Sequence, residues 1–393
     1  MISQAVILAG GAGTRLKPYT DTAPKSMFPF EGTPFLEYLI NQIKNFGITD
    51  ILLLLGYMPE AIINYFGDGS NLGVNIKYDI TPVDYETGKR LKAASLKLND
   101  NFLLLYCDNY CPIDYVKALN QYEENNPLIQ ITCYTNNDCY TKNNIKVGSD
   151  FLVEKYDKSR KLDNLQGVDI GYVFVNKKSL NLLSDENINF EAEIYPKLVE
   201  QKKLGVFLTD HRYYSIGSYE RIELTKEFFR PKKVAFLDRD GTINLRAGKA
   251  QYIEKPEQFV WLDGARTAIS ILKQKGYTII LITNQPGIAR GIITLKDLES
   301  IHEKMQSDLE NNRFDKIYFC PHGWYDDCDC RKPKAGMLYQ AARDFSLDLT
   351  KCILIGDDER DITAGKTVGC ISYMVDESHN LLSIVRNLED TWE

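Results

Sequence analysis

The stretch AVILAGGAGTRLKP, residues 5–18, decides the fold of the first half of the chain. Its apolar opening is too short for a helix and is typical of a buried strand. The glycines that follow allow a tight turn in which backbone N–H groups approach phosphates closely, and a helix start after the turn adds partial positive charge. Arg15 and Lys25 supply full charges suited to a triphosphate. No Gly-Lys-Ser/Thr follows the glycines, so this is not the ATPase P-loop.

A second stretch of this kind, VAFLDRDGT at residues 234–242, opens the other half of the chain. It is again an apolar strand that ends in polar residues, here the carboxylates of Asp238 and Asp240. Ligands of open α/β sheets bind outside the carboxyl ends of the strands. The sequence therefore predicts two sites that handle phosphate, one in each half of the chain.

The alternation of elements predicts two mixed α/β domains. Short apolar runs flanked by polar breaks indicate buried strands; they lie at 5–8, 51–55, 102–106, 234–237, 277–282 and 352–355. The segment 34–46 carries an apolar face at helical spacing.

The length of the chain, 393 residues, also favours two domains, because single cores stop growing at about 250 to 300 residues. Proline and charge around Pro231 mark a break between the halves. We predict one domain at residues 1–225, a linker at 226–232 and a second domain at 233–393.

The composition excludes several classes of protein. A formal net charge of −7 argues against a general nucleic-acid binder, which needs clustered Lys and Arg. The chain has no secretion signal and no apolar stretch near the roughly 20 residues of a membrane span. We expect a cytoplasmic protein with no nucleic-acid or membrane partner. The sequence leaves the oligomeric state open, a homo-oligomer included.

The nine cysteines fall into two groups. Six are scattered and are expected to be reduced thiols. The other three, Cys320, Cys328 and Cys330, join His322 within eleven positions. Three thiolates and one imidazole are the donor set of a closed tetrahedral Zn²⁺ site. We expect a structural zinc that pins the loop leading to Arg331 and Lys332.

Polar residues recur in order after the strands of the second half. A nucleophilic carboxylate, a hydroxyl, a lysine and a distal metal-binding carboxylate form a complete phosphoryl-transfer set. The members are Asp238, Asp240, Thr283, Asn284, Arg331, Lys332 and Asp357.

This ordered set resembles the haloacid dehalogenase superfamily, which implies a Rossmann-like fold and Mg²⁺-dependent phosphatase activity. By that resemblance Asp238 attacks phosphorus, and Asp240 protonates the leaving oxygen and then activates water. Asp357 binds Mg²⁺ together with Asp238 and the backbone carbonyl of Asp240, while Thr283 and Lys332 hold the phosphoryl oxygens. The zinc ligands before Arg-Lys-Pro-Lys and the segment TNQPGIARG, 283–291, resemble heptose 1,7-bisphosphate phosphatases, a pattern that histidinol phosphate phosphatases partly share.

The first half resembles sugar-1-phosphate nucleotidyltransferases, which have a Rossmann-like fold and release pyrophosphate. The resemblance rests on the glycine turn with Thr14-Arg15-Leu16, Pro18, Thr20 and Pro24-Lys25. The segments PFLEYL at 34–39, Gly56-Tyr57 and YFGD at 65–68 are most similar to the heptose- and mannose-1-phosphate guanylyltransferases.

The same resemblance assigns roles in the first site. Gly10, Gly11, Gly13, Thr14 and Arg15 hold the nucleotide. Lys25 neutralises charge at the attacked phosphorus, and Asp108 is the Mg²⁺ ligand. Asp169 and Glu191 contact sugar hydroxyls, and the second lysine is Lys158 or Lys155.

Two departures from the family pattern affect the first site. Ser215 stands where a second metal-binding Asp is usual, and a hydroxyl is a poor Mg²⁺ ligand. The loop TGKRLK, residues 87–92, is closer to glucose-1-phosphate cytidylyltransferases than to guanylyl enzymes.

Together these features predict a bifunctional enzyme of nucleotide-sugar synthesis. It removes the 7-phosphate of D-glycero-D-manno-heptose 1,7-bisphosphate and transfers a nucleotidyl group, with GTP favoured, to the 1-phosphate. Mg²⁺ and a structural Zn²⁺ are the expected cofactors, and a nucleoside triphosphate and a sugar phosphate the expected substrates. One alternative changes the sugar to a mannose type or the nucleotide to CTP, and a second makes the N-terminal domain a non-catalytic nucleotide binder. A third, a polynucleotide-end phosphatase, disagrees with the acidic charge and the zinc loop.

Overall fold

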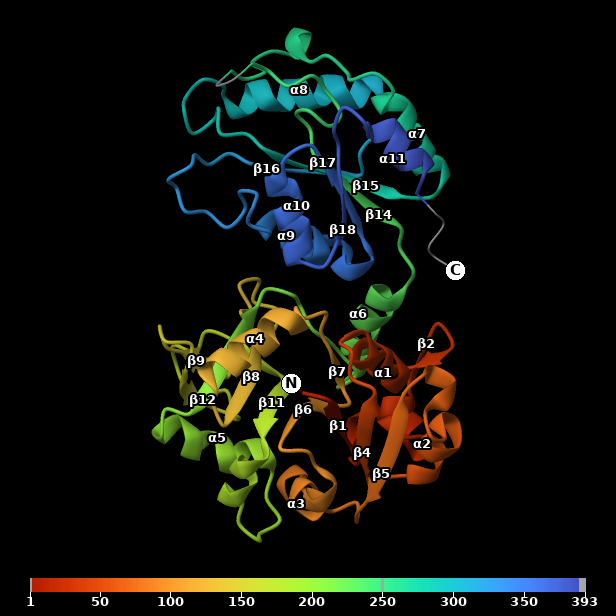
Figure 1. The fold of residues 1–393 in the computed structure, drawn as a ribbon, viewed down its shortest axis with the longest axis vertical. Coiled ribbons are helices and arrows are strands. Elements are labelled where there is room, and N and C mark those ends of the chain that lie inside the picture. The colour runs from red at the N-terminus through yellow and green to blue at the C-terminus, as the bar shows by residue number, and fades with distance from the viewer. Residues whose placement is uncertain (1, 249–250, 389–393) are drawn as a thin grey trace. The chain divides into compact units, whose positions relative to one another are not determined.

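The computed structural model describes residues 2–248 and 251–388. The chain divides after Phe229 into two compact units (Figure 1). Each unit is built on a sheet of largely parallel strands. None of the helices in the described part of the chain combines the length and the apolar character that a membrane span needs.

A mixed seven-stranded sheet forms the centre of the first unit, in the order β12-β8-β11-β6-β1-β4-β5. Strand β11 is antiparallel to β6 and β8, and the other neighbours pair in parallel. The bounds are β1 Gln4–Ala9, β4 Asp50–Leu55, β5 Asn75–Ile80, β6 Asn101–Tyr106, β8 Ile129–Tyr134, β11 Val168–Asn176 and β12 Leu204–Thr209. Three short pairs complete it: β2 Pro29–Phe30 with β3 Thr33–Pro34, β7 Asn109–Tyr110 with β13 Tyr214–Ser215, and β9 Ile145–Val147 with β10 Val153–Tyr156.

Helices cover both faces of this sheet. Strand β1 shows why, because Ala5 and Ile7 pack into one apolar cluster while Val6 and Leu8 pack into the other, as the two-residue period of a strand requires. Four helices lie on the first face, namely α1 Phe35–Asn45, α2 Pro59–Phe66, α4 Tyr115–Asn125 and α6 Tyr219–Phe229; α3 Thr87–Ala93 and α5 Phe190–Glu200 lie on the second.

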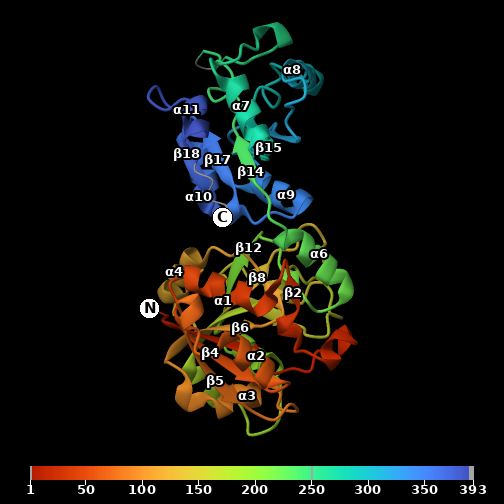
Figure 2. The same ribbon diagram turned by 90° about the vertical axis from the view of Figure 1, so that its right-hand side faces the viewer.

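The second unit has a fully parallel five-stranded sheet, in the order β16-β15-β14-β17-β18. Figure 2 labels the strands β15, β14, β17 and β18 of this sheet. Its strands are β14 Val234–Leu237, β15 Thr278–Asn284, β16 Lys316–Cys320, β17 Ile353–Gly356 and β18 Ile371–Met374. On one face pack α7 Ala265–Gln274, α8 Leu295–Asp308 and α11 Leu381–Arg386, and on the other α9 Gly336–Phe345 and α10 Glu359–Thr367. The mixed α/β architecture predicted for both halves is confirmed, and the predicted strands begin within one residue of the observed ones.

The segment between the halves differs from the linker expected at 226–232. Helix α6 continues to Phe229, so the first residues of that linker are helical. Phe229 stacks on Tyr38 with ring centroids 4.0 Å apart, and it also meets the rings of Phe30 and Tyr110. The helix ends directly before Arg230-Pro231, because a proline disfavours the helical conformation of the residue that precedes it. Burial of the aromatic rings keeps the residues up to Phe229 helical. The last five residues of the domain predicted at 233–393 lie outside the described residues.

Replacing Phe229 by alanine tests this boundary. Loss of its aromatic contacts should destabilise the first unit by about 3 to 5 kcal/mol and leave the second unit unchanged. Urea unfolding, followed separately for the two units by hydrogen exchange, measures both effects. Leu96, which is 97% exposed, provides the control, since L96A should change the stability by less than about 0.5 kcal/mol. Equal destabilisation of both units by F229A would contradict this assignment of the helix.

Candidate active sites

The first site lies at the carboxyl ends of β1, β4, β5 and β6. These strands are parallel neighbours, so the residues that follow them gather at one edge of the sheet. They border a cavity of about 270 Å³. Gly10 and Gly11 enter it after β1, and Asp108 enters it after β6. The sequence predicted this edge from the position of the glycine turn.

Lys25 and Asp108, predicted separately from the sequence, form an ion pair in this cavity. The ammonium of Lys25 lies 2.6 Å from a carboxylate oxygen of Asp108. Burial alone raises the pKa of Asp108, but Lys25 and the more distant Arg15 outweigh it and hold the pKa below its ordinary value. Asp108 is therefore an anion that can share its charge between a lysine and a divalent cation.

Arg90 explains two glycines of this site, and sequence reasoning missed it as a site residue. Its guanidinium is buried and donates to the carbonyls of Gly10 and Leu55 and to the segment 81–83. A Cβ on Gly10 would lie 2.4 Å from the guanidinium carbon, and a Cβ on Gly56 would lie 2.6 Å from one of its nitrogens. Arg90 thus joins the glycine turn to the opposite wall of the cavity.

The glycine turn continues differently from the expectation. An α-helix start was expected after it, but residues Thr14–Leu16 form a single turn of 3-10 helix, and Pro18 follows closely. Gly13 has a φ of +62°, and a Cβ there would meet the Cβ of Lys25 at 2.9 Å. Positive charge at this turn therefore comes from Lys25 and the exposed Arg15 more than from a helix dipole.

The predicted sugar-contacting residues come together beside the same cavity. A bulge of β11 separates Asp169 from the regular strand, and burial together with Glu191 raises the pKa of Asp169 to about 8. Lys155, on β10, and Lys158 are both exposed, but Lys158 lies 3.4 Å from a carboxylate oxygen of Glu191. The structure thus brings Lys158, of the two candidate lysines, to these carboxylates. Tyr106, which lines the cavity, has its pKa raised by burial and by Glu191.

Ser215 lies next to the Asp108 segment. It pairs with Asn109 between β13 and β7, and the N–H of Ile216 donates to the carbonyl of Asp108 at 3.0 Å. Ser215 stands where the family pattern usually has a second metal-binding Asp. The structure places its hydroxyl-bearing side chain on the strand next to the Asp108 segment. Among the described residues, the first unit has no group of three clustered metal-binding side chains.

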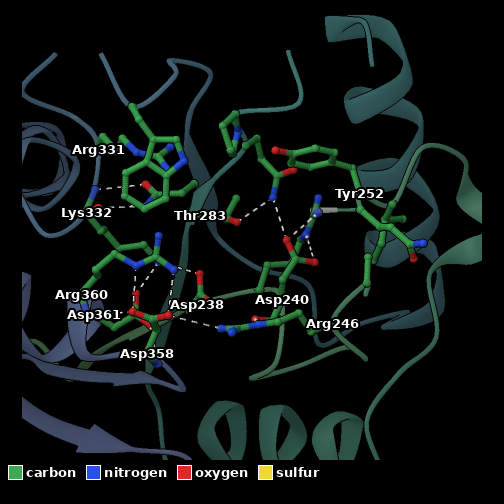
Figure 3. A pocket seen from close by; sticks show the side chains of 18 of the residues that line it. Asp238, Asp240, Arg246, Tyr252, Thr283, Arg331, Lys332, Asp358, Arg360 and Asp361 are labelled. Atoms are coloured by element: carbon green, nitrogen blue, oxygen red, sulfur yellow. Dashed lines mark hydrogen bonds and ion pairs between the residues drawn. The ribbon is translucent and has the colours of Figure 1, made fainter. Parts of the chain in front are cut away.

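The second site is a larger cavity of about 790 Å³ at the carboxyl ends of the parallel strands of the second unit. Figure 3 shows its side chains converging from four loops. Asp238 follows β14, Thr283 is the last residue but one of β15, and Asp357 follows β17. The sequence predicted this convergence, because parallel strands end at one edge of a sheet.

Lys332 is held between two buried carboxylates at the base of this cavity. Its ammonium lies 2.6 Å from both Asp238 and Asp361 and donates to the carbonyl of Ile282 at 2.8 Å. Burial opposes the charge of Lys332, but the two carboxylates outweigh it and raise the pKa. Burial likewise raises the pKa of Asp238 against the opposing effect of Lys332. The carboxylate of Asp238 and the ammonium of Lys332 are thus fixed relative to each other.

Three carboxylates form a candidate cation site. The carboxylate oxygens of Asp238, Asp357 and Asp361 lie within 4.8 Å of one another. Oδ1 of Asp357 is buried and accepts no hydrogen bond from the described residues, while its other oxygen lies 2.7 Å from Arg246. Burial raises the pKa of Asp357 to about 6. A hard divalent cation fits this set, since it prefers carboxylate oxygens and satisfies such an orphaned atom.

Asp240 is held by donors on both of its oxygens. Arg239 donates through Nε and Nη2 at 3.1 and 2.8 Å, Asn244 donates to Oδ1 at 3.0 Å, and Gln285 donates to Oδ2 at 2.9 Å. Burial raises the pKa of Asp240, but these donors outweigh it and hold the pKa below its usual value. Gln285 also donates to Oγ1 of the buried Thr283 at 2.9 Å.

Asn284 and Arg331 have positioning contacts. The side chain of Asn284 exchanges two hydrogen bonds of 3.0 Å with the backbone of Lys332, so it fixes the loop that carries the lysine. The guanidinium of Arg331 donates to the carbonyl of His322 at 3.1 Å and lies 4.3 Å from the ring centre of Trp324. Both residues line the cavity, but neither of their side chains contacts Asp238 directly among the hydrogen bonds and ion pairs of the described residues.

Comparison with known proteins agrees with two enzymatic units. The family model described as nucleotidyl transferase matches residues 4–232, and that described as haloacid dehalogenase-like hydrolase matches residues 182–369. The chain belongs to the nucleotidyl transferase family. Its second half belongs to the haloacid dehalogenase-like hydrolases, so the chain joins a nucleotidyltransferase to a phosphatase.

Individual relatives match each half. The D-glycero-beta-D-manno-heptose-1,7-bisphosphate 7-phosphatase of Haemophilus ducreyi is 40% identical over 147 residues, which cover 35% of this chain and 79% of that protein. The D-glycero-D-manno-heptose-1,7-bisphosphate 7-phosphatase of Chlorobaculum tepidum is 40% identical over 162 residues, covering 38% and 80%. The crystal structure of HddC from Yersinia pseudotuberculosis matches with a TM-score of 0.50 and 24% identity, covering 58% of this chain and all of HddC; this likeness shows the fold.

The Cys/His cluster of the phosphatase unit is assembled as predicted. Cys320 ends β16, and His322, Cys328 and Cys330 follow on the next loop. Sγ of Cys320 lies 3.6 Å from Sγ of Cys328, and Nδ1 of His322 lies 3.2 Å from Sγ of Cys330. Two thiolates on a tetrahedral Zn²⁺ stand about 3.8 Å apart, so the donors fit that ion. None of the nine cysteines forms a disulfide in the described structure.

Asp361 is a further carboxylate of the phosphatase site, and the sequence analysis assigned it no role. It is the third residue of α10, and its carboxylate accepts from the N–H of Asp358 in a capping box. That cap turns Asp361 inward, where it is 2% exposed. The spacing of a capping box was a readable signal, but its inward direction depends on how α10 packs on β17 and β18.

Gly241 gives a sharp test of the aspartate arrangement. It has a φ of +97°, and a Cβ there would lie 1.8 Å from Oδ2 of Asp357. G241A should displace Asp357 and lower phosphatase activity by about a hundredfold or more. Gly276 is a matched control, because it has a φ of +81° but no atom within 4 Å of its Cβ. G276A should cost about 1 kcal/mol of stability and leave activity unchanged, and equal activity losses in both variants would contradict the steric explanation.

Proposed function

We propose that this chain catalyses two consecutive steps of nucleotide-sugar synthesis. The phosphatase unit hydrolyses the 7-phosphate of D-glycero-D-manno-heptose 1,7-bisphosphate. The transferase unit then joins the remaining sugar 1-phosphate to a nucleotide, with GTP favoured, and releases pyrophosphate to give a GDP-heptose. The observation that carries the proposal is the presence, in one chain, of a buried aspartate nucleophile site and a glycine turn facing a Lys–Asp pair. The names of the phosphatase relatives support the choice of sugar.

In the phosphatase step, an oxygen of Asp238 bonds to phosphorus as the bond from phosphorus to the sugar oxygen breaks. Asp240, which carries a proton in the substrate complex although its donors favour the anion in the free protein, gives that proton to the departing oxygen. In the second half-reaction Asp240 takes a proton from water, the water oxygen bonds to phosphorus, and the bond between Asp238 and phosphorus breaks. Lys332 and Thr283 stabilise the charge on the phosphoryl oxygens.

Mg²⁺ is the cation that we assign to the phosphatase carboxylates. Asp238, Asp357 and the backbone carbonyl of Asp240 would hold it, and Asp361 stands beside them. Bound there, it would offset the negative charge of the nucleophile and of the phosphoryl group. Asp108 would hold the corresponding ion in the transferase unit.

In the transferase step, Gly10, Gly11, Gly13 and Thr14 bind the triphosphate through the backbone of the turn. An oxygen of the sugar 1-phosphate bonds to the α-phosphorus as pyrophosphate departs. Arg15 and Lys25 offset the negative charge that develops on the phosphate oxygens during this step. Asp169, Glu191 and Lys158 face the sugar phosphate. The raised pKa of Asp169 suits a carboxyl group that donates a hydrogen bond to a sugar hydroxyl.

The experiment that tests both halves uses the full chain with Mg²⁺, each anomer of heptose 1,7-bisphosphate and each nucleoside triphosphate in turn. Mass spectrometry resolves phosphate, pyrophosphate and nucleotide sugar. We expect phosphate release first and GDP-heptose with GTP. D238N should slow phosphate release by several orders of magnitude and leave the transfer to sugar 1-phosphate intact, whereas D108N should have the reverse effect.

Two other outcomes lead to the alternatives. A nucleotide sugar formed with CTP, or from mannose 1-phosphate, would replace the base or the sugar in the proposal, as the loop at residues 87–92 suggests. Nucleotide binding with no pyrophosphate release under any condition would make the first unit a nucleotide-binding module. Ser215 motivates that second alternative, because its hydroxyl replaces a carboxylate beside Asp108.

We also propose that the Cys/His cluster binds a structural Zn²⁺ that holds the loop before Arg331 and Lys332. C328S should lower the zinc content of the purified protein and the unfolding temperature of the second unit, because metal binding and folding are coupled. Zinc analysis and calorimetry measure the two effects. C139S is the control, since Cys139 is exposed in the first unit. Unchanged zinc content in C328S would remove this cysteine from the site.

A further inference from the structure

The residue between the two catalytic aspartates is a buried arginine for which the proposed mechanism has no role. Arg239 is 1% exposed. Its guanidinium stays charged at all ordinary pH values, and a buried charge requires a partner. That partner is Asp240, which Arg239 binds through two nitrogens at 3.1 and 2.8 Å. Arg239 is thus the most buried of the described cations of the phosphatase unit, and its charge is paired with Asp240.

His302 completes this contact from the helix behind it. It lies on α8 and is 8% exposed, and its Nε2 stands 3.4 Å from Nη1 of Arg239. A guanidinium can only donate, so Nε2 of His302 accepts and the ring proton sits on Nδ1. Burial and the charge of Arg239 lower the pKa of His302 to about 3, which keeps the ring neutral. From sequence alone His302 was expected to be an ordinary helix residue.

The contacts form a chain from α8 to the active site. His302 fixes Nη1 of Arg239, and the other two nitrogens of Arg239 fix Oδ1 and Oδ2 of Asp240. Asn244 and Gln285 each add one bond to Asp240, but both are neutral amides, and only Arg239 contacts both oxygens among the donors that the structure describes. Without His302, a buried N–H of Arg239 would lack an acceptor, and the guanidinium would turn towards another one.

We propose that Arg239 and His302 are positioning residues that hold the carboxylate of Asp240 in place for proton transfer, with His302 acting through Arg239. This inference rests on the proposed role of Asp240 as the acid and base of the phosphatase. It assigns to α8 a part in the reaction, although α8 itself contributes no residue to the lining of the cavity.

The two half-reactions depend differently on Asp240, and this difference provides the test. A sugar alkoxide needs a proton to depart, so phosphorylation of Asp238 by a sugar phosphate requires a correctly placed Asp240. Nitrophenolate departs without a proton, so phosphorylation by para-nitrophenyl phosphate does not. Hydrolysis of the aspartyl-phosphate needs Asp240 as a base with either substrate.

The experiment is rapid-mixing kinetics of H302L in the full-length holoenzyme with para-nitrophenyl phosphate. We expect a burst of about one nitrophenolate per active site, followed by a steady-state rate about tenfold or more below wild type. Intact-mass analysis should show the phosphorylated protein accumulating. With the heptose bisphosphate the released product is the sugar 1-phosphate. Its release should show no burst in H302L, because formation of the aspartyl-phosphate is itself slowed.

Two further variants separate positioning from general destabilisation. H302Q places an acceptor oxygen at the reach of Nε2 and should restore the steady-state rate, whereas the shorter H302N should not. M305A removes a fully buried side chain of the same helix and should lower stability without producing a burst. If H302L does not fold, comparison of H302Q with H302N still tests whether His302 acts by accepting the hydrogen bond from Arg239.

Several outcomes would overturn the inference. The first is that H302L and H302N both hydrolyse para-nitrophenyl phosphate with wild-type kinetics. The second is that the burst and the steady-state rate fall by the same factor in both variants. The third is that M305A shows the same burst as H302L. The substrate proposal fails independently: a wild-type protein that hydrolyses the aryl phosphate but not the heptose bisphosphate would refute the assigned sugar and leave the test of His302 intact.

Discussion

The phosphatase unit depends on one electrostatic constraint, the burial of Lys332 between Asp238 and Asp361. Each ion pair is 2.6 Å long and both carboxylates are buried. Removing Lys332 would leave the two buried carboxylates without this cation in a low-dielectric site, which is far more costly than losing a surface ion pair. The loop that carries Lys332 is also fixed by Asn284, and the cysteine and histidine cluster precedes it. These supports place a cation and a nucleophile within contact before any substrate arrives.

In the transferase unit, fewer charged side chains hold the site in place. Its Lys25–Asp108 pair is partly open to the cavity, and the glycine turn is held from beneath by Arg90, whose guanidinium binds backbone carbonyls instead of carboxylates. A buried cation satisfied by carbonyl dipoles fixes backbone geometry without adding negative charge near a triphosphate. The contact also accounts for Gly10 and Gly56, since a side chain at either position would collide with the guanidinium.

The two units are thus both α/β folds, but they differ in which carboxyl groups have a raised pKa. In the phosphatase unit, burial and the neighbouring carboxylates raise the pKa of Asp238 and Asp357; a divalent cation would offset that concentration of negative charge. In the transferase unit the raised carboxyl pKa belongs to Asp169, beside Glu191 and away from the Lys25–Asp108 pair. In the transferase unit the carboxylate proposed to hold the metal, Asp108, is thus distinct from the two proposed to contact the sugar.

The sequence by itself determined the two α/β halves, the strand positions, the glycine turn, the Asp-x-Asp motif and the four clustered metal donors. These features are local: an apolar run between polar breaks, or a fixed spacing along the chain, carries its own signal. The tertiary structure alone decided the end of α6 at Phe229, the choice of Lys158 over Lys155, the inward turn of Asp361 and the contacts of Arg90, Arg239 and His302. Each of these depends on which side chain another element brings within a few ångströms, and spacing along one segment cannot reveal a partner that lies tens of residues away.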